Sequence, residues 1–159
     1  MKFADWLENW GMTKLKISAP FLTMEWSPEP DDQEAAWELY IELLTRVTTQ
    51  RLPLEHGEEQ RALSSIYELF PLTRDILKSK GRKCREFSRI SIVVLNQIVR
   101  PFTAKWHSRL AENTPLTGQA GNEFRADLYE LQGELVRYAR MLADMAGVED
   151  LTQLEQSSD

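Results

Sequence analysis

A stripe of apolar residues at helical spacing runs through residues 83–110. Successive members lie three or four positions apart, which places them on one face of an α-helix. The stripe consists of Phe87, Ile90, Val94, Ile98 and Phe102, and it is widened by Cys84, Leu95, Val99 and Trp106. A helix that is apolar on more than half of its circumference lies at the centre of a helical assembly, so we expect 83–110 to be the central helix. Lys105 and Arg109 fall on the apolar side of a straight helix, and a kink at Pro101 would relieve that conflict.

Three further segments, 31–49, 58–80 and 122–146, carry the same periodicity. The last is the most regular, with apolar residues spaced 4-3-4-3-4-3 as in a heptad repeat. These residues are Phe124, Leu128, Leu131, Leu135, Tyr138, Leu142 and Met145. Such a stripe forms either the seam of a helical bundle or the interface of a homodimer, and both interpretations stay open at this point.

The first 27 residues have a different pattern. Phe3, Trp6 and Trp10 have helical spacing, whereas Lys14–Ser18 alternates polar and apolar residues and Phe21–Trp26 is a second extended candidate. These signals predict a short helix followed by a β-hairpin. Because exposed tryptophans are favoured binding anchors, Trp6, Trp10 and Trp26 are candidates for docking a partner. The alternative is that the segment only covers one end of the helices.

Together these patterns predict an all-α fold, an irregular antiparallel four-helix bundle with a small N-terminal helix and β-hairpin. We expect a single domain over 1–159, with a cap at 1–27, the bundle at 31–146 and a short tail at 148–159. Asp31 followed by Glu34 predicts a capping box at the start of the first bundle helix. Expected core residues are Ile66, Phe87, Val94, Ile98, Leu128, Leu135 and Leu142.

Charge is distributed unevenly in this chain, whose net charge is −6. Between positions 78 and 109 there are nine Lys and Arg residues and one acid, Glu86. The residues that we expect to bind an anionic partner or a partner protein are Lys78, Lys80, Lys83, Arg85, Arg89 and Arg100. In the alternative interpretation, acids on neighbouring helices neutralise this strip. Nucleic acid is a possible partner, but a pI near 5.1 and the lack of an aromatic residue within the strip argue against it.

Known catalytic and metal-binding patterns are scarce in the sequence. Two histidines and one cysteine, without a C-x-x-C or H-E-x-x-H motif, do not suit a zinc site, so we expect no metal and no cofactor. Cys84 falls on the apolar side of its helix and is expected to be a buried thiol. The sequence has no stretch of the roughly 20 apolar residues that span a membrane and no signal-peptide pattern, so we expect a cytoplasmic protein without a membrane partner.

Arg100 and His107, with six residues between them, form one pattern with catalytic potential. Their spacing resembles the loose R-x(4–6)-H motif of the HEPN ribonucleases, which are small all-α bundles. The resemblance implies metal-independent RNA cleavage by a cooperating arginine and histidine, usually across a dimer. On a straight helix the two residues share a face, and Asn96 lies about one turn before Arg100, where it could orient them.

The sequence favours a non-catalytic function over an enzyme. We expect an adaptor or accessory protein of a bacterial-type system, which binds a protein partner through the Trp-rich N-terminal segment and the basic strip. The alternatives are the HEPN-like ribonuclease with Arg100, His107 and Asn96, and a nucleic-acid-binding helical module.

Overall fold

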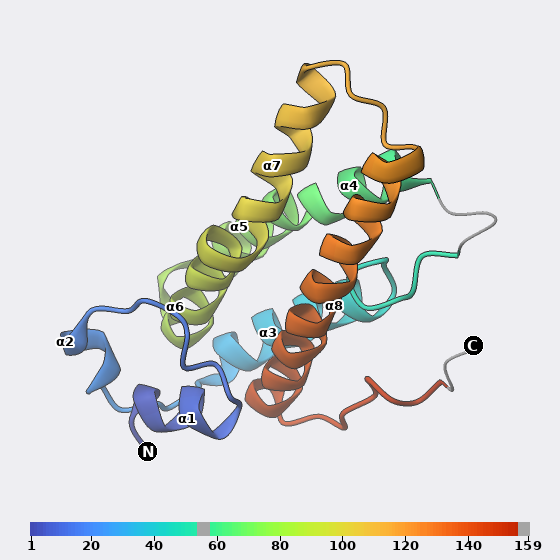
Figure 1. Ribbon diagram of the computed structural model, residues 1–159. Coiled ribbons are helices and arrows are strands. Elements are labelled where there is room, and N and C mark those ends of the chain that lie inside the picture. Colours follow the sequence, from blue (N-terminus) through green and yellow to red (C-terminus); the bar gives the residue numbers. More distant parts are fainter. Residues whose placement is uncertain (54–57, 156–159) are drawn as a thin grey trace.

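The computed structural model describes residues 1–53 and 58–155, and it is mostly helical, which confirms the predicted all-α class (Figure 1). The α-helices are α1 (Phe3–Asn9), α2 (Ala19–Leu22), α3 (Pro30–Leu44), α4 (Glu59–Tyr67), α5 (Leu69–Lys80), α6 (Arg85–Val94), α7 (Arg100–Ala111) and α8 (Gly118–Ala146). A 3₁₀ turn, η1 (Gly81–Lys83), connects α5 to α6, and a π-helical turn, η2 (Leu95–Val99), joins α6 to α7. Within the described ranges, the structure has no helix that is both long and apolar enough to cross a membrane.

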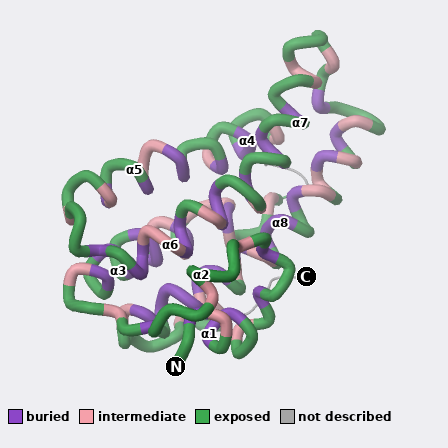
Figure 2. Tube along the Cα trace, turned by 90° about the vertical axis from the view of Figure 1, so that its left-hand side faces the viewer, coloured by how far each residue is buried: buried purple, intermediate pink, exposed green. Residues whose placement is uncertain are grey.

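The core is organised around α3, which packs most extensively against α8 and also against α5 and α6. α6, η2 and α7 form one continuous helical path, and α7 projects upward beside the first turns of α8 (Figure 1). Figure 2 shows buried residues along the facing sides of these helices. Six expected core residues are buried: Ile66, Phe87, Val94, Leu128, Leu135 and Leu142. Ile98 is only partly buried, because it lines a groove between η2 and α8.

The heptad stripe of α8 is the seam of this fold. All seven of its side chains are at most 5% exposed within the single chain. A homodimer through the 124–145 stripe would need that surface to be free, so the dimer interpretation of the stripe is wrong. The helix ends at Gly147, whose φ of 69° is a left-handed conformation that favours glycine.

The predicted segment 58–80 is two helices, α4 and α5, with the break at Glu68. Pro71 is the third residue of α5. The first four amides of a helix have no intrahelical acceptor, so the missing N–H of proline costs little there. Pro71 therefore lies in the first turn of α5 and not in the interior of one long helix.

The central segment passes Pro101 without ending. Just before it, the amide of Arg100 donates to the carbonyl of Leu95, five residues back, which is the π-helical bond of η2. The expected conflict at Lys105 and Arg109 is relieved by contacts with α8 rather than by a kink alone. Both cations lie over the indole ring of Trp106, 5.0 and 5.2 Å from a ring centroid, and both pair with Glu123 of α8.

The predicted β-hairpin is wrong. In the described part of the chain, the one β-bridge is an isolated antiparallel pair between Lys2 and Glu25, and α2 occupies the expected second strand start. The backbone of Lys16 is paired with a side chain instead of a strand. Its amide donates to Gln97 Oε1 and its carbonyl accepts from Gln97 Nε2, both at 2.8 Å. Because Gln97 satisfies both groups, this backbone needs no partner strand.

One buried carboxylate organises the start of two helices. Asp32 accepts hydrogen bonds from the amide of Glu29 at 2.9 Å and from the amide of Phe87, in the first turn of α6, at 3.0 Å. Its residue is 1% exposed. The capping interaction of α3 is therefore made by Glu29 and Asp32 and not by Asp31 and Glu34. The expected tail at 148–159 packs back through Tyr40, whose hydroxyl donates to the carbonyl of Glu149, and residues 156–159 of it lie outside the described part.

Candidate functional site

The tryptophans of the N-terminal segment are mostly structural. Trp6 and Trp26 are 3% and 8% exposed, and their rings stack with centroids 4.1 Å apart. Trp6 Nε1 also donates to Asp144 Oδ2 of α8 at 2.7 Å. Trp10 is half-buried. The prediction that Trp6 and Trp26 are exposed docking anchors is wrong, because they attach residues 1–27 to the helical body and leave almost no surface for a partner.

The same segment forms an apolar groove against α6. The groove has a volume of about 370 Å³ and is lined by Phe3, Lys16, Ile17, Ser18, Phe21, Ser88, Arg89, Ile92 and Val93. Two of these apolar residues are unusually open to solvent, since Phe21 is 47% and Ile92 is 48% exposed. Gln97 holds Lys16 in place at one end of the groove. The sequence did not indicate this groove, because its walls come together only when residues 16–21 fold across α6.

The basic strip is neutralised only in part. Lys80 donates to Glu34 and Glu38 of α3, and these hydrogen bonds raise the pKa of its ammonium. Arg89 pairs with Glu86 at 2.7 Å. Burial raises the pKa of Glu86, and Arg89 opposes that rise by favouring the charged carboxylate.

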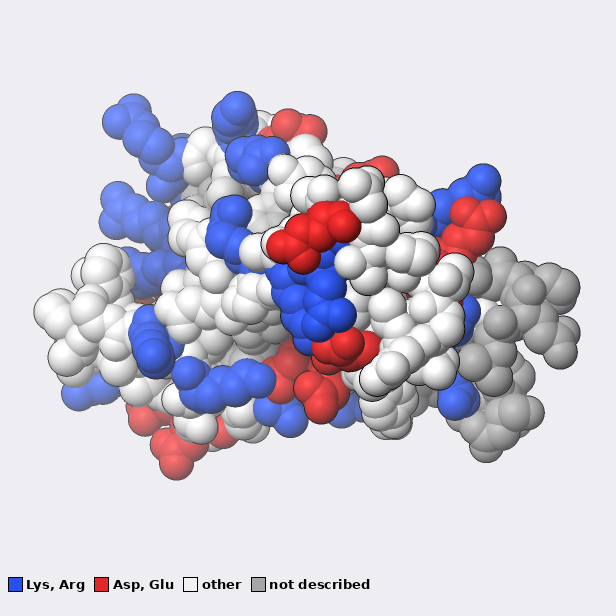
Figure 3. Space-filling view, turned by 45° about the horizontal axis from the view of Figure 1, so that its top comes forward, with Lys and Arg blue, Asp and Glu red and all other residues white. Residues whose placement is uncertain are grey.

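The other predicted members of the strip, Lys78, Lys83, Arg85 and Arg100, are exposed. No carboxylate among the described residues forms an ion pair with any of them. Figure 3 shows Lys and Arg side chains gathered toward the side where α5 and α6 lie in Figure 1, with few acids among them. The strip therefore keeps uncompensated positive charge on an acidic protein.

Asn96, Arg100 and His107 share one face of the η2–α7 helix, as the sequence predicted. Asn96 Oδ1 accepts from Arg100 Nε at 3.2 Å and from Arg100 Nη2 at 3.0 Å. The Arg100 guanidinium lies 4.6 Å from the centre of the Phe70 ring, and the His107 ring meets Tyr67 edge-on at 5.1 Å. Arg100 and His107 therefore contact two different aromatic rings, Phe70 of α5 and Tyr67 of α4.

This arrangement does not form an acid–base pair within one chain. Arg100 and His107 are seven residues apart, which is about 10 Å along a helix at 1.5 Å per residue. Their side chains rest on two different rings rather than on each other. A single phosphate would have to reach both groups for the chemistry implied by the HEPN resemblance, so the ribonuclease hypothesis needs a movement of Arg100 or a second copy of the chain.

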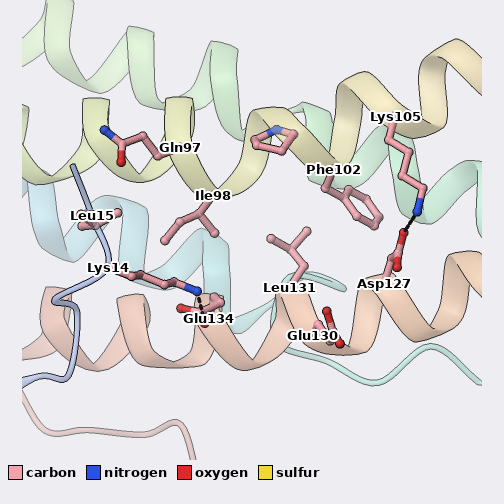
Figure 4. A pocket seen from close by; sticks show the side chains of 11 residues that line it. Lys14, Leu15, Gln97, Ile98, Phe102, Lys105, Asp127, Glu130, Leu131 and Glu134 are labelled. Atoms are coloured by element: carbon pink, nitrogen blue, oxygen red, sulfur yellow. Dashed lines mark hydrogen bonds and ion pairs between the residues drawn. The ribbon is translucent and has the colours of Figure 1, made fainter.

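A second groove, which the sequence did not indicate, separates α7 from α8 (Figure 4). It has a volume of about 620 Å³, with Ile98, Phe102 and Leu131 as apolar walls. Two ion pairs cross it, Lys14 with Glu134 and Lys105 with Asp127, the latter at 2.7 Å. Asp127 also accepts from Trp106 Nε1 at 3.1 Å. These pairs connect α8 to residue 14 and to α7, so the groove is braced by the chain's own charges.

Cys84 is buried, and its thiol donates to the carbonyl of Gly81, as expected for a structural residue. Within residues 1–53 and 58–155, no three His, Cys, Asp or Glu side chains form a group that could hold a metal ion. Comparison of the chain with protein-family models, with curated proteins and with solved structures finds no match. The two grooves and the basic strip are the surfaces of the described residues with features suited to binding.

Proposed function

We propose that this protein is a non-catalytic accessory protein that binds an acidic, amphipathic segment of a partner protein in the groove between residues 16–21 and α6. The observation that carries the proposal is the combination of exposed Phe21 and Ile92 with the cations Lys16 and Arg89 around one cavity. This keeps the N-terminal segment and the basic strip as the docking elements, but it replaces the buried tryptophans with Phe21 and Ile92.

The apolar part of the groove fits a side chain of the partner. A volume of about 370 Å³ is small, and it accommodates one or two large apolar side chains rather than a folded element. Binding hot spots are typically anchors of this kind that fill a pocket and exclude water. Phe21 and Ile92 are buried only when a ligand covers them. The hydrophobic effect therefore favours binding of an apolar side chain in the groove.

The charges around the groove select an acidic partner. The charged residues that line it are Lys16 and Arg89, and no carboxylate is among its lining residues. Arg89 also pairs with Glu86 outside the groove, so the excess positive charge comes from Lys16 and from a neighbouring arginine. Arg85 lies one helical turn before Arg89 on the same face of α6, and it is exposed. Complementary charge across an interface increases the association rate and excludes partners of like charge. A segment with aspartate or glutamate next to an aromatic or aliphatic residue meets both requirements.

The test is selection of peptides from a random display library on the purified protein, followed by affinity measurement of the enriched sequences. We expect enriched peptides to combine acidic with large apolar residues and to bind more weakly at high salt. Ile92→Glu places a like charge in the groove, so we expect at least a tenfold loss of affinity. Tyr129→Glu is the matched control, because Tyr129 is an exposed apolar residue of α8 away from the groove.

Two results would overturn the proposal. One is that no acidic amphipathic sequence is enriched. The other is that the enriched peptides bind Ile92→Glu as tightly as they bind the native protein and the Tyr129→Glu control. The thermal melting temperature of each variant, measured in parallel, shows whether a loss of affinity comes from the groove or from unfolding.

A further inference from the structure

A second exposed surface lies on the other flank of the basic strip, between α5 and the α6–α7 helix. Two ring contacts fix its geometry: Tyr67 meets His107, and Phe70 lies under Arg100. Tyr67 is the last residue of α4 and Phe70 the second residue of α5. Residue numbers rise from Tyr67 to Phe70 while those of their partners fall from His107 to Arg100, so this segment runs antiparallel to α7. Figures 1 and 2 both show α5 beside this helix.

Cations continue this surface beyond the rings. Arg74 and Lys78 follow Phe70 at intervals of four residues, which places them on the same flank of α5. Both are exposed, and like Arg100 they form no ion pair with a carboxylate of the described residues. From Arg85 to His107 the opposite helix spans 22 residues, or roughly 33 Å at 1.5 Å per residue. The surface is thus a track with aromatic rings at one end and unpaired positive charge along its length.

We propose that this track binds single-stranded nucleic acid, with Tyr67 stacking on a base and Arg100, Arg74 and Lys78 contacting phosphates. Proteins that bind single strands without sequence preference combine these two elements, a cationic path for the backbone and an aromatic platform for a base. The proposal corrects the expectation that the basic strip lacks an aromatic residue. Tyr67 and Phe70 join it from α4 and α5, which precede the strip in sequence.

Tyr67 is suited to stacking because its ring remains available. The residue is 47% exposed although it contacts both Phe70 and His107. The contact with His107 is edge-on, with an angle of 77° between the ring planes, so the imidazole does not lie flat on the tyrosine. The exposed part of Tyr67 is the surface on which we expect a base to stack.

Arg100 is held in position for a phosphate. Asn96 accepts from its Nε and Nη2, which leaves three of the five guanidinium N–H donors for a ligand. Phe70 supports the plane of the guanidinium. A side chain that is already oriented loses less conformational freedom on binding, and its planar fork suits phosphate oxygens. Arg89 pairs with Glu86, whereas no carboxylate of the described residues forms an ion pair with Arg100.

The residues assigned to this site, Tyr67, Arg74, Lys78 and Arg100, lie on α4, α5 and α7 and do not line the peptide groove, which is formed by Phe3, residues 16–21 and α6. The experiment measures fluorescence anisotropy of labelled oligo(U) and oligo(dT) 12-mers with the purified protein. Oligo(dT) has no 2′-hydroxyl, so its binding is separate from any RNA cleavage. We expect both to bind at low salt, with affinity falling steeply as salt rises.

Variants assign the binding to the track. Removing a stacking aromatic weakens single-strand binding by roughly 5- to 150-fold, so we expect a loss in that range for Tyr67→Ala. Tyr129→Ala removes an exposed tyrosine of α8 and should leave the affinity unchanged. Arg100→Gln should reduce the slope of log K against log salt by about 0.7, the value for one phosphate contact on a single strand. Arg61→Gln, which removes an exposed arginine on α4, is its control.

The proposal is overturned if neither oligonucleotide binds at low salt, or if Tyr67→Ala and Arg100→Gln bind as tightly as their controls. It is also overturned if an acidic peptide competes for the track at lower concentration than the oligonucleotides, because the surface would then belong to a protein partner. Ile92→Glu should bind both oligonucleotides normally. That variant separates failure of this proposal from failure of the peptide groove.

Discussion

Asp32 offers the sharpest test of how this fold is held together, because one buried carboxylate accepts from the amides of Glu29 and Phe87. Asp32→Asn keeps the shape of the side chain but replaces one acceptor oxygen with an NH₂ group, which cannot accept a hydrogen bond. One of the two amides is then left without a partner, and a buried unsatisfied amide costs about 1–3 kcal/mol. Asp32→Ala leaves both amides unsatisfied, so its cost is about 3–6 kcal/mol, given about 1.5–3 kcal/mol for each bond to a charged group.

The assay is urea unfolding followed by circular dichroism, together with the melting temperature. For a chain of this length, 1 kcal/mol corresponds to about 2–4 °C, so Asp32→Asn should lower the melting temperature by about 2–12 °C. Asp31→Asn is the matched control, since it removes the same charge from the same turn of α3 and should cost at most about 1 kcal/mol. If Asp32→Asn were no more destabilising than Asp31→Asn, a single carboxylate would not be holding both helix starts.

Three further predictions concern the seam, the pH dependence and the catalytic alternative. Leu135→Ala should lower the free energy of unfolding by about 2–5 kcal/mol in urea titration, because Leu135 is fully buried; an unchanged midpoint would contradict its place in the seam. Hydrogen bonds from Lys105 and Arg109 lower the pKa of Glu123 from 4.5, so its stabilisation should be present above pH 4.5 and be lost as the pH falls through the lowered pKa. The stability difference between native protein and Glu123→Gln, measured by urea unfolding from pH 7 to pH 3, should accordingly shrink on acidification, and a difference that grows would refute the assignment. Neither the native protein nor His107→Ala should cleave a fluorescent RNA, whereas cleavage that disappears in His107→Ala would establish the ribonuclease alternative.

Helical periodicity predicted the positions of the long helices because it depends on local spacing alone. Residues such as Leu135 and Phe87 are buried at the places where their stripes put them. The β-hairpin failed for a tertiary reason. The alternating pattern at 14–18 corresponds to a turn, a bend and irregular backbone, and the partner of Lys16 is the side chain of Gln97, about 80 residues later, which no local pattern indicates.

The candidate site was predictable in part. The shared face of Asn96, Arg100 and His107 follows from helical geometry, and the structure retains it. The composition of residues 1–27 shows many tryptophans but does not show their burial, so it suggested Trp6 and Trp26 where Phe21 and Ile92 are the exposed residues. The ion pairs of the basic strip also depend on the tertiary fold, because acids distant in sequence, such as Glu34 and Glu38, pair with Lys80. The sequence does not show these pairings.

The π-helical turn η2 sets the rotational phase between two halves of one continuous helix. One residue fewer within 95–99 would turn α7 by about 100° relative to α6. Arg100 and His107 would then leave Phe70 and Tyr67, while Ile92 and Arg89 would stay at the groove. A single-codon deletion in this turn would thus take Arg100 out of the track while Tyr67, Arg74 and Lys78 keep their places on α4 and α5.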